Sequence, residues 1–387
     1  MNTTVESGVI RNGSPRARAI GTLREWIVQG RLQPGMPLPS ERELCRHIGV
    51  GLATVQRALR VLTAEGLIQV RDGHTRLLGN TATGNESAIF RQTLMILAPA
   101  EAPLAGHAQP GWSEYIGIGA ASAARREGQG VLSLAPSRLL NQSADRMLSV
   151  RPSGLLVCEM GIAERQALVD FIRILAGEGI PVVVYGNTPL DEQYDRVISD
   201  HAAGSYMLTR NLLDRGCRRI LPLFEKPEGV YWKKDRLAGY ARAMREHGLE
   251  PLPTLWADDL GGYYTVEHFR VKSSYLAGQL VPHLTGPDPI DAIMAASDGE
   301  AFAVAAACRM FGRRPQKDIF LAGYDNYYVD SPEQEMESSI PSVTVDKQNF
   351  LLGQEMVRLL QDRVAGTAGE GPQLRLVPPR LIFRDLP

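Results

Sequence analysis

The sequence predicts an α/β protein in which a small N-terminal domain precedes a larger body with parallel sheets. Three observations support this prediction. Residues 37–70 contain two helical patterns, a glycine turn between them and the start of a β-hairpin. Residues 79–88, GNTATGNESA, are small and polar and mark the clearest domain boundary. After this boundary, apolar strand-like runs alternate with helical patterns, as in parallel sheets covered by helices.

The N-terminal domain is expected to contain a helix-turn-helix. A first helix is predicted at about 15–29 from the spacing of its apolar residues. Ser40 and Glu43 match the S-x-x-E capping box and predict that a second helix begins at about residue 41. Gly49-Val50-Gly51 ends this helix and supplies the tight turn that a helix-turn-helix requires.

The helix after this turn, predicted at about 52–65, has two different faces. Its core face carries Val55, Ala58, Leu59 and Leu62. The opposite face carries Ala53, Gln56, Arg57 and Arg60, with Thr54 towards the helix start. Recognition helices contact base edges and phosphates with such residues. Gly66 is expected to end the helix, and Asp72-Gly73 predicts the turn of a hairpin that follows.

Two runs, GRLQPGMPLPSEREL and T-V-x-R-A-L-x-x-L-x-x-E-G-L-I, carry a family resemblance over roughly residues 14–78. The segment resembles the winged helix-turn-helix of the GntR family of bacterial transcription regulators. The resemblance implies that a set of residues faces DNA: Ser40, Arg42, Thr54, Gln56, Arg57, Gly73 and His74. Leu52 and Gln56 stand where the family usually has Arg, the commonest specific partner of guanine, so the bases that are read stay open.

The charge of the chain is divided unevenly. Residues 1–80 contain 11 Arg, no Lys and 6 acidic residues, a net charge of about +5, whereas the remainder carries about −6. A basic domain on a mildly acidic body is expected when only one end of the molecule contacts phosphate. The alternative is a winged helix that serves as a protein–protein adapter, and this charge asymmetry argues against it.

Length and composition are those of a globular protein of two or three domains, with 387 residues, 44% of them hydrophobic and 22% charged. No apolar run approaches the roughly 18 residues of a membrane span, and no signal peptide is evident. A cytoplasmic protein without membrane contact is therefore expected. The wide spacing of the four cysteines favours buried free thiols over disulfides or a metal site: Cys45, Cys158, Cys217 and Cys308.

The body is predicted to alternate strands and helices. Strands are expected at 93–98, 130–134, 154–158, 181–185, 197–199, 219–223, 292–296 and 319–324. Helices are expected at 114–128, 164–177, 202–215, 234–247, 300–311 and 348–363. This alternation favours sheets wound with helices on both faces.

Four stretches of the body carry a second resemblance: VISDHAAGSYMLTRNLLDRGCRRI, KDRLAGYARAMREHGLEP, DAIMAASDGEAFAVAAACRMFGRRPQKDIFLAGYDN and SIPSVTVDKQNFLLGQEMVRLL. They resemble the core of LacI/GalR-type repressors, which is itself similar to type I periplasmic binding proteins. The resemblance is strongest over 197–360 and weaker over 93–187. It implies two α/β lobes joined by crossover strands, with a small ligand clamped at the carboxyl ends of the strands.

The same resemblance implies a set of effector-binding residues. Arg236 matches an arginine that holds sugar hydroxyls, and Asp325 matches the aspartate of a G-[FY]-D turn. Ser297 stands where the family often has Asn, just before Asp298, and both are candidate effector-binding residues. Planar guanidinium and carboxylate groups each engage paired hydroxyls. The alternatives are a surface charge near a helix start for Arg236, an N-cap of the helix near Glu300 for Asp298 and a turn residue for Asp325.

The first wall of this site departs from the family pattern. Gly186 stands where some sugar-binding relatives carry an aspartate, Asn187 lies beside it, and the loop 99–111 is longer than usual. Four aromatic residues are candidates to stack on a sugar, with core packing or surface positions as the alternative: Trp112, Tyr185, Tyr231 and Trp232.

Enzymatic motifs are weak or missing in the sequence. Gly117-x-Gly119 is a partial dinucleotide motif, but it falls inside a helical pattern, which favours close helix packing. No P-loop, H-E-x-x-H or G-x-S-x-G occurs, and the seven His residues lack metal-ligand spacing, so neither a catalytic role nor a cofactor or metal is expected. The acidic pairs Asp191-Glu192 and Asp258-Asp259 are expected on solvated loops.

Together, the two resemblances suggest the arabinose-repressor type of bacterial regulator. The expected domains are a DNA-binding head at 14–78, a linker at 79–90 and a ligand-binding and dimerising body at 91–387. The hypothesis is a homodimeric repressor that binds double-stranded DNA at a near-palindromic operator and is gated by a small effector, a sugar in the first instance. The alternative is a non-sensing scaffold whose body only dimerises.

Overall fold

A computed structural model describes residues 15–28, 32, 37–64, 68–71, 75–78, 93–98, 112–134, 151–158, 165–260, 265–327, 332–339 and 341–384. The chain divides into two compact units. The first comprises Met1–Thr93 with Ser143–Ser153, and the second comprises Leu94–Gln142 with Gly154–Pro387.

Within its described residues, the N-terminal unit has three helices and a two-stranded antiparallel hairpin. Its elements are α1 (Pro15–Val28), α2 (Glu41–Ile48), α3 (Leu52–Ala64), β1 (Ile68–Arg71) and β2 (Thr75–Leu78). In the hairpin, Ile68 pairs with Leu78 and Arg71 with Thr75. Buried apolar side chains from all three helices and β1 form one core: Ala19, Leu23, Leu44, Val55, Ala58, Leu59, Leu62 and Ile68. The core face predicted for the second helix of the motif is confirmed.

Both ends of α2 are fixed by local chemistry. The Ser40 hydroxyl accepts a hydrogen bond from the Glu43 amide, and the Ser40 amide donates to the Glu43 carboxylate, which confirms the capping box. Gly49 ends the helix with a left-handed φ of 72°, which a glycine adopts without steric cost. The predicted tight turn is therefore confirmed, whereas Gly66 and the Asp72-Gly73 turn lie outside the described residues.

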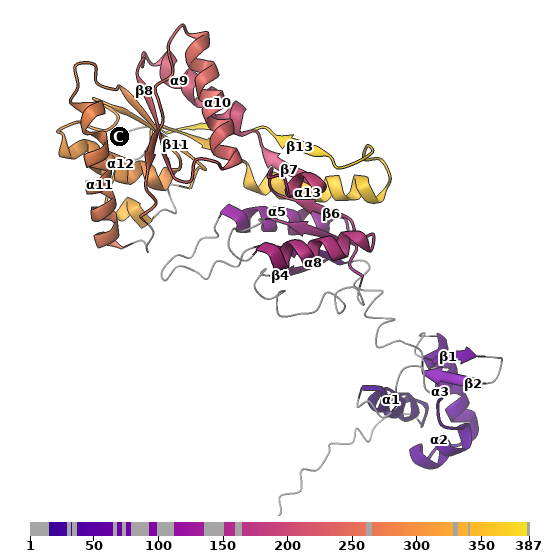
Figure 1. The fold of residues 1–387 in the computed structure, drawn as a ribbon. Coiled ribbons are helices and arrows are strands. Elements are labelled where there is room, and N and C mark those ends of the chain that lie inside the picture. The colour runs from indigo at the N-terminus through magenta and orange to yellow at the C-terminus, as the bar shows by residue number, and fades with distance from the viewer. Residues whose placement is uncertain are drawn as a thin grey trace, which may run out of the picture. The chain divides into compact units, whose positions relative to one another are not determined.

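The second unit contains two six-stranded sheets, each of which defines a lobe (Figure 1). The strand order is β13-β7-β6-β5-β3-β4 in the first lobe and β14-β12-β11-β10-β8-β9 in the second. First-lobe strands are β3 (Thr93–Leu97), β4 (Gly130–Leu134), β5 (Gly154–Val157), β6 (Val182–Val184), β7 (Asp195–Ser199) and β13 (Leu374–Val377). Second-lobe strands are β8 (Ile220–Glu225), β9 (Leu255–Ala257), β10 (Ala292–Ala295), β11 (Phe320–Tyr324), β12 (Val343–Asp346) and β14 (Arg380–Phe383). The chain crosses between lobes three times, after β7, after β12 and after β13, as the two-lobed prediction requires.

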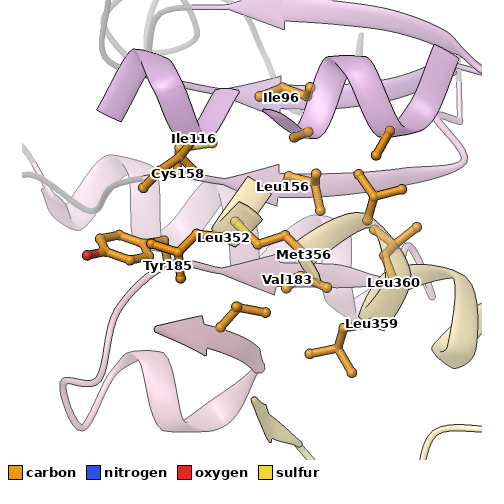
Figure 2. Close-up of a cluster of buried hydrophobic side chains, with 14 of the residues drawn as sticks. Ile96, Ile116, Leu156, Cys158, Val183, Tyr185, Leu352, Met356, Leu359 and Leu360 are labelled. Atoms are coloured by element: carbon orange, nitrogen blue, oxygen red, sulfur yellow. The ribbon is translucent and has the colours of Figure 1, made fainter. Parts of the chain in front are cut away.

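The described residues of the first lobe form helices α5 (Trp112–Arg126), α8 (Arg165–Gly177) and α13 (Asn349–Val364). Side chains of α5 and α13 pack with those of β3, β5 and β6 in one apolar cluster (Figure 2). Two glycines allow α5 and α13 to approach closely. A Cβ at Gly119 would lie 2.0 Å from the Phe350 carbonyl oxygen, and one at Gly353 would lie 1.9 Å from that of Ile116. The interpretation of Gly117-x-Gly119 as a packing motif is therefore confirmed.

The second lobe is a sheet covered on both faces (Figure 1). Helices α9 (His201–Asp214) and α10 (Tyr231–Glu246) bury one face, and α11 (Val266–Leu284) and α12 (Asp298–Met310) bury the other. Its pairings are parallel except that β12 and β14 are antiparallel. Short 3-10 turns occur at η1 (Asp191–Gln193) and η3 (Pro332–Glu335). The sequence prediction missed α11 and the short strands β9, β12, β13 and β14.

Candidate functional site

Several of the residues predicted to face DNA lie exposed on the helix-turn-helix. Arg42 on α2 and Arg57 and Arg60 on α3 are exposed, and Leu52 at the start of α3 is 46% exposed. Thr54 lies near the same end of α3 and is half-buried. Ser40 is exposed, although its hydroxyl already serves in the α2 cap. These positions leave an arginine-bearing surface on the two helices.

Gln56 is placed differently from a freely exposed DNA-reading residue. Its amide donates to the Glu41 carboxylate at 2.7 Å, and the same carboxylate forms an ion pair with Arg76 on β2. The hydrogen bond from Arg76 is the largest cause that lowers the pKa of Glu41. This contact ties the start of α2 to α3 and to the hairpin. Gly73 and His74, the predicted hairpin tip, lie outside the described residues.

In the body, Arg236 is the centre of the candidate effector site. It is 4% exposed on α10, so a surface charge near a helix start is excluded. Its Nη1 donates to the Ala296 carbonyl at 2.6 Å, and its Nη2 donates to Asp325 Oδ1 at 3.3 Å. The guanidinium carbon lies 4.4 Å from the centroid of the Trp232 ring and 3.3 Å from that of Tyr324. The structure therefore brings Arg236 of α10 together with Asp325, which follows β11, as predicted.

Asp325 combines both of the roles that the sequence left open. It is a turn residue with a φ of 88° after β11, and its carboxylate also meets two cations. Besides Arg236, Lys347 lies with its Nζ 3.1 Å from Asp325 Oδ1. Lys347 follows β12, and the sequence prediction missed it. Arg236 and Lys347 thus share one oxygen of the Asp325 carboxylate.

Ser297 and Asp298 have structural partners that differ from the predicted ones. Ser297, not Asp298, caps α12, because its hydroxyl accepts from the Glu300 amide at 3.2 Å. Asp298 is fully buried and accepts hydrogen bonds from Thr344 at 2.7 Å and Arg384 at 3.3 Å. Burial raises the pKa of Asp298 to about 6, although Arg384 opposes this shift. The N-cap interpretation of Asp298 was wrong, and α12 begins two residues earlier than expected.

Near the end of β6, Asn187 Oδ1 accepts a hydrogen bond from Arg196 at 3.0 Å. Beside it, the space next to Gly186 is taken by the Asp191 carboxylate, which an added Cβ would meet at 2.4 Å. Asp191 is 1% exposed, so the prediction that it lies on a solvated loop was wrong. The prediction holds for Asp258, whose side chain is 58% exposed. A carboxylate is therefore present at this wall of the site, from a different position than the family pattern suggests.

Aromatic residues surround these charges. Tyr185 lies at the edge of the first-lobe cluster with its hydroxyl directed away from the aliphatic side chains (Figure 2). A side-chain hydrogen bond joins it to Tyr231 of the second lobe, and burial raises the pKa of both hydroxyls. Trp232 stacks on Arg236, whereas the side chain of Trp112 lies outside the described residues. Two of the four predicted aromatics thus join the lobes at this place.

His201, which the sequence prediction missed, is buried among these rings. Its ring centroid lies 6.0 Å from that of Tyr231 and 6.1 Å from that of Tyr324. Neither of its ring nitrogens has a hydrogen-bond partner among the described residues. Burial first, and then the charges of Arg236 and Lys347, lower the pKa of His201 well below its usual value. A neutral imidazole donates through one nitrogen and accepts through the other.

A pair of carboxyl groups links the first turn of α12 to the end of β8. Glu300 forms a side-chain hydrogen bond with Glu225, and its Oε2 accepts from the Ala296 amide at 3.1 Å. Lys272 Nζ lies 2.6 Å from Glu225 Oε1. Burial, followed by repulsion from Glu225, raises the pKa of Glu300 to about 8. Glu300 therefore holds a proton at neutral pH and fixes the backbone segment that receives Arg236.

We predict that this group makes the protein less stable as the pH rises. Because the pKa of Glu300 is higher in the folded chain, its stabilising contribution is complete below the unfolded pKa of about 4.3. It is lost as the pH rises through about 8. Thermal unfolding at pH 5 and pH 8.5 is expected to show a smaller fall in Tm for Glu300→Gln than for wild type. Equal decreases in Tm for wild type and Glu300→Gln would contradict the raised pKa of Glu300.

Comparisons with known proteins agree with this architecture. Residues 15–75 match the family described as bacterial regulatory proteins, gntR family, and residues 209–385 match the periplasmic binding protein-like domain. The HTH-type transcriptional regulator CelR of Thermobifida fusca is 32% identical over 207 residues, which are 53% of this chain and 56% of CelR. The HTH-type transcriptional repressor PurR of Escherichia coli O139:H28 is 28% identical over 320 residues, which are 80% of each chain. Both relatives are transcriptional regulators rather than enzymes.

Among solved structures, the transcriptional regulator CelR-cellobiose complex superimposes with a TM-score of 0.56 and 21% sequence identity. The match covers 90% of this chain and 99% of that chain, and it shows a shared fold. In the described part of the chain, no helix is both long and apolar enough to cross a membrane, and no group of three or more candidate metal ligands occurs. The sequence match to CelR of Thermobifida fusca, in contrast to the structural match, spans just over half of the length of CelR.

Proposed function

From the union in one chain of a GntR-type helix-turn-helix domain and a periplasmic-binding-protein-like domain, we propose a DNA-binding transcription regulator with an effector-gated operator affinity. The N-terminal unit binds duplex DNA, and the two-lobed body binds a small polar effector. By analogy with a relative described as a repressor, the regulator blocks transcription. It acts in the cytoplasm as a homodimer on a near-palindromic operator, because two heads related by two-fold symmetry read two half-sites.

One observation carries the effector-binding part of the proposal. Arg236 and His201 are buried, and Asp325 is 14% exposed, near the carboxyl ends of parallel strands, where ligands of such sheets bind. Neither ring nitrogen of His201 has a partner in the described part of the chain, although buried polar groups are normally satisfied. A polyol supplies both the donors and the acceptors that such a site needs. If the body only mediated dimerisation, it would not need buried polar groups that lack partners.

The contact between the lobes suggests how binding is transmitted. Tyr185 of the first lobe and Tyr231 of the second are hydrogen-bonded at this place, so an effector among these groups contacts both lobes. Binding shifts the equilibrium between two arrangements of the lobes. The size of this shift is set by the difference between the affinities of the effector for the two arrangements. Repression is relieved if the effector-bound arrangement holds the two heads at an unsuitable spacing.

The effector class is a sugar, and thermal shift tests this part of the proposal. A similar structure is that of a transcriptional regulator in complex with cellobiose, so cellobiose is one candidate. The resemblance to the arabinose-repressor type makes a pentose a second candidate. The panel is cellobiose, L-arabinose, D-glucose and D-glucose 6-phosphate. A sugar at 100 times its Kd is expected to add about 2.7 kcal/mol of stability. If none of the four raises the Tm, a sugar effector is excluded for this panel and the scaffold alternative is favoured.

For the head, we predict that Arg57→Ala weakens operator binding about 5- to 150-fold, equivalent to about 1–3 kcal/mol. Arg57 is exposed on α3 beside the other arginines, and no ion pair in the described residues depends on it. Fluorescence anisotropy with an operator selected from random duplexes measures the effect at several salt concentrations.

The matched control for this substitution is Arg173→Ala in the body, where the arginine is 59% exposed and pairs with Asp170. It removes the same charge, and operator affinity is expected to stay at the wild-type value. The slope of the logarithm of the binding constant against the logarithm of the salt concentration is expected to decrease for Arg57→Ala only. The expected decrease corresponds to the release of about one counterion fewer. Equal affinities of Arg57→Ala and wild type would exclude this helix as the DNA-contacting element.

A further inference from the structure

Asp191 has one satisfied and one unsatisfied carboxylate oxygen. It lies in η1 after β6 and is 1% exposed. Its Oδ2 accepts a hydrogen bond from the Thr188 amide at 2.7 Å, which closes the turn. Its buried Oδ1 has no partner in the part of the chain that the structure describes. The turn therefore explains only one of the two oxygens.

The space for this carboxylate depends on Gly186. A Cβ at position 186 would lie 2.4 Å from Asp191 Oδ2 and 3.2 Å from Oδ1, well inside van der Waals contact. Only a residue without a side chain leaves the carboxylate where it is. Gly186 thus allows η1 to fold back and place a buried charge beside the end of β6.

The same carboxylate is close to the candidate effector site. Its negative charge acts on the Tyr231 hydroxyl and, after burial, is the largest cause that raises the pKa of that group. Tyr231 is hydrogen-bonded to Tyr185 and lies 6.0 Å, ring to ring, from His201. Asp191 also packs against Gly186, which directly follows Tyr185, so its carboxylate lies beside the aromatic residues of the candidate effector site.

A buried carboxylate oxygen without a donor is costly, because it has lost its water without gaining a hydrogen bond. Such a group needs a compensating partner, and a bound molecule with a donor provides one. An anionic molecule would be repelled at this oxygen, whereas a neutral hydroxyl group would donate to it. The chemistry therefore favours a neutral sugar over a sugar phosphate.

We propose that Asp191 is a specificity-determining residue of the effector site, whose Oδ1 accepts a hydrogen bond from a hydroxyl group of a neutral sugar. This inference rests on the proposed function. Arg236 supplies donors on one side of the sugar, and Asp191 supplies the matching acceptor. An effector without a hydroxyl group at this position binds more weakly.

The test is Asp191→Asn in the full chain. Asparagine keeps the size of the side chain and the oxygen that accepts from Thr188, and it replaces the unsatisfied oxygen by an amide donor. Without sugar, the Tm of the variant is expected to equal or exceed that of wild type, since a buried unpaired charge is removed. The Kd for the neutral sugar that stabilises wild type most, from cellobiose, L-arabinose and D-glucose, is expected to rise about 10-fold or more.

Asp195→Asn is the matched control. Asp195 is also buried, but its oxygens are all engaged, by Arg363 at 2.7 and 2.8 Å and by the Gln373 amide at 2.7 Å. This variant is expected to lower the Tm and to leave the Kd for the sugar unchanged. The two aspartates are thus expected to respond in opposite ways.

Three outcomes would overturn the inference. A Tm of Asp191→Asn that falls as far as that of Asp195→Asn would show that the carboxylate is structural. A sugar that binds wild type and Asp191→Asn equally well would remove Asp191 from the site and leave the proposed function intact. If no neutral sugar stabilises wild type, the proposed function fails in its effector class and this inference fails with it.

Discussion

Replacing Arg236 by glutamine is expected to lower the affinity of the protein for its sugar effector about 100-fold or more. The guanidinium is 4% exposed, and it bonds the Ala296 carbonyl and Asp325 while it lies against two aromatic rings. Its position is therefore fixed before any ligand binds. Two charge-assisted hydrogen bonds to sugar hydroxyls, each of about 1.5 kcal/mol or more, account for the expected loss. Isothermal titration calorimetry with the sugar that stabilises wild type measures it.

The control for this substitution is Arg314→Gln, which removes the same group from an exposed pair with Asp318. Its sugar affinity is expected to match that of wild type. The Tm of Arg236→Gln without sugar is expected to fall only modestly, because Lys347 still neutralises Asp325 at 3.1 Å. A variant that keeps the wild-type sugar affinity would exclude Arg236 from the effector site.

Gly353→Ala is expected to destabilise the first lobe by about 3 kcal/mol, the largest stability effect that we predict. An added Cβ would lie 1.9 Å from the Ile116 carbonyl oxygen and 2.5 Å from the Ala120 amide nitrogen. Both are backbone atoms of α5, so one whole helix must move away from the other and the shared core must loosen. Thermal or urea unfolding of the body is expected to show an earlier transition.

The matched control is Gly278→Ala in α11, where an added Cβ meets no atom within 4 Å. Alanine is the better helix former, so this variant is expected to gain about 0.5–1 kcal/mol. The two substitutions add the same methyl group within helices, and only the packing around it differs. Equal stabilities of the two variants would contradict the close contact of α5 with α13.

The features that sequence reasoning identified depend on local chemistry or on a shared motif. The α2 cap follows from Ser40 and Glu43, which are three residues apart and need no distant partner. The alternation of strands and helices in the body follows from apolar periodicity. The pairing of Arg236 with Asp325, 89 residues apart, came from family resemblance and not from any local pattern.

The features that it missed depend on packing that no local sequence pattern reveals. A solvated loop was a reasonable prediction for Asp191 from its acidic neighbour, but the turn buries it against Gly186. His201 stands at a helix start, and nothing in its local sequence shows that aromatic rings from α10 and β11 enclose it. Helix α11 has a weak apolar pattern, with Val266 72% exposed and Pro282 near its end. The rings around His201 are remote in sequence, whereas Gly186 is close to Asp191 and no local pattern predicts that the turn buries the carboxylate.

The central claim is that a small molecule in the body changes the affinity of the head for DNA. The most direct test is a gel shift with the full chain and a selected operator, with and without the sugar that stabilises the protein in thermal shift. The account predicts a change in operator affinity of about 5- to 150-fold, the range of an allosteric coupling of about 1–3 kcal/mol. This change is expected to disappear in Arg236→Gln, whose operator affinity without sugar stays at the wild-type value. An operator affinity that is the same with and without a sugar bound to the body would contradict the claim.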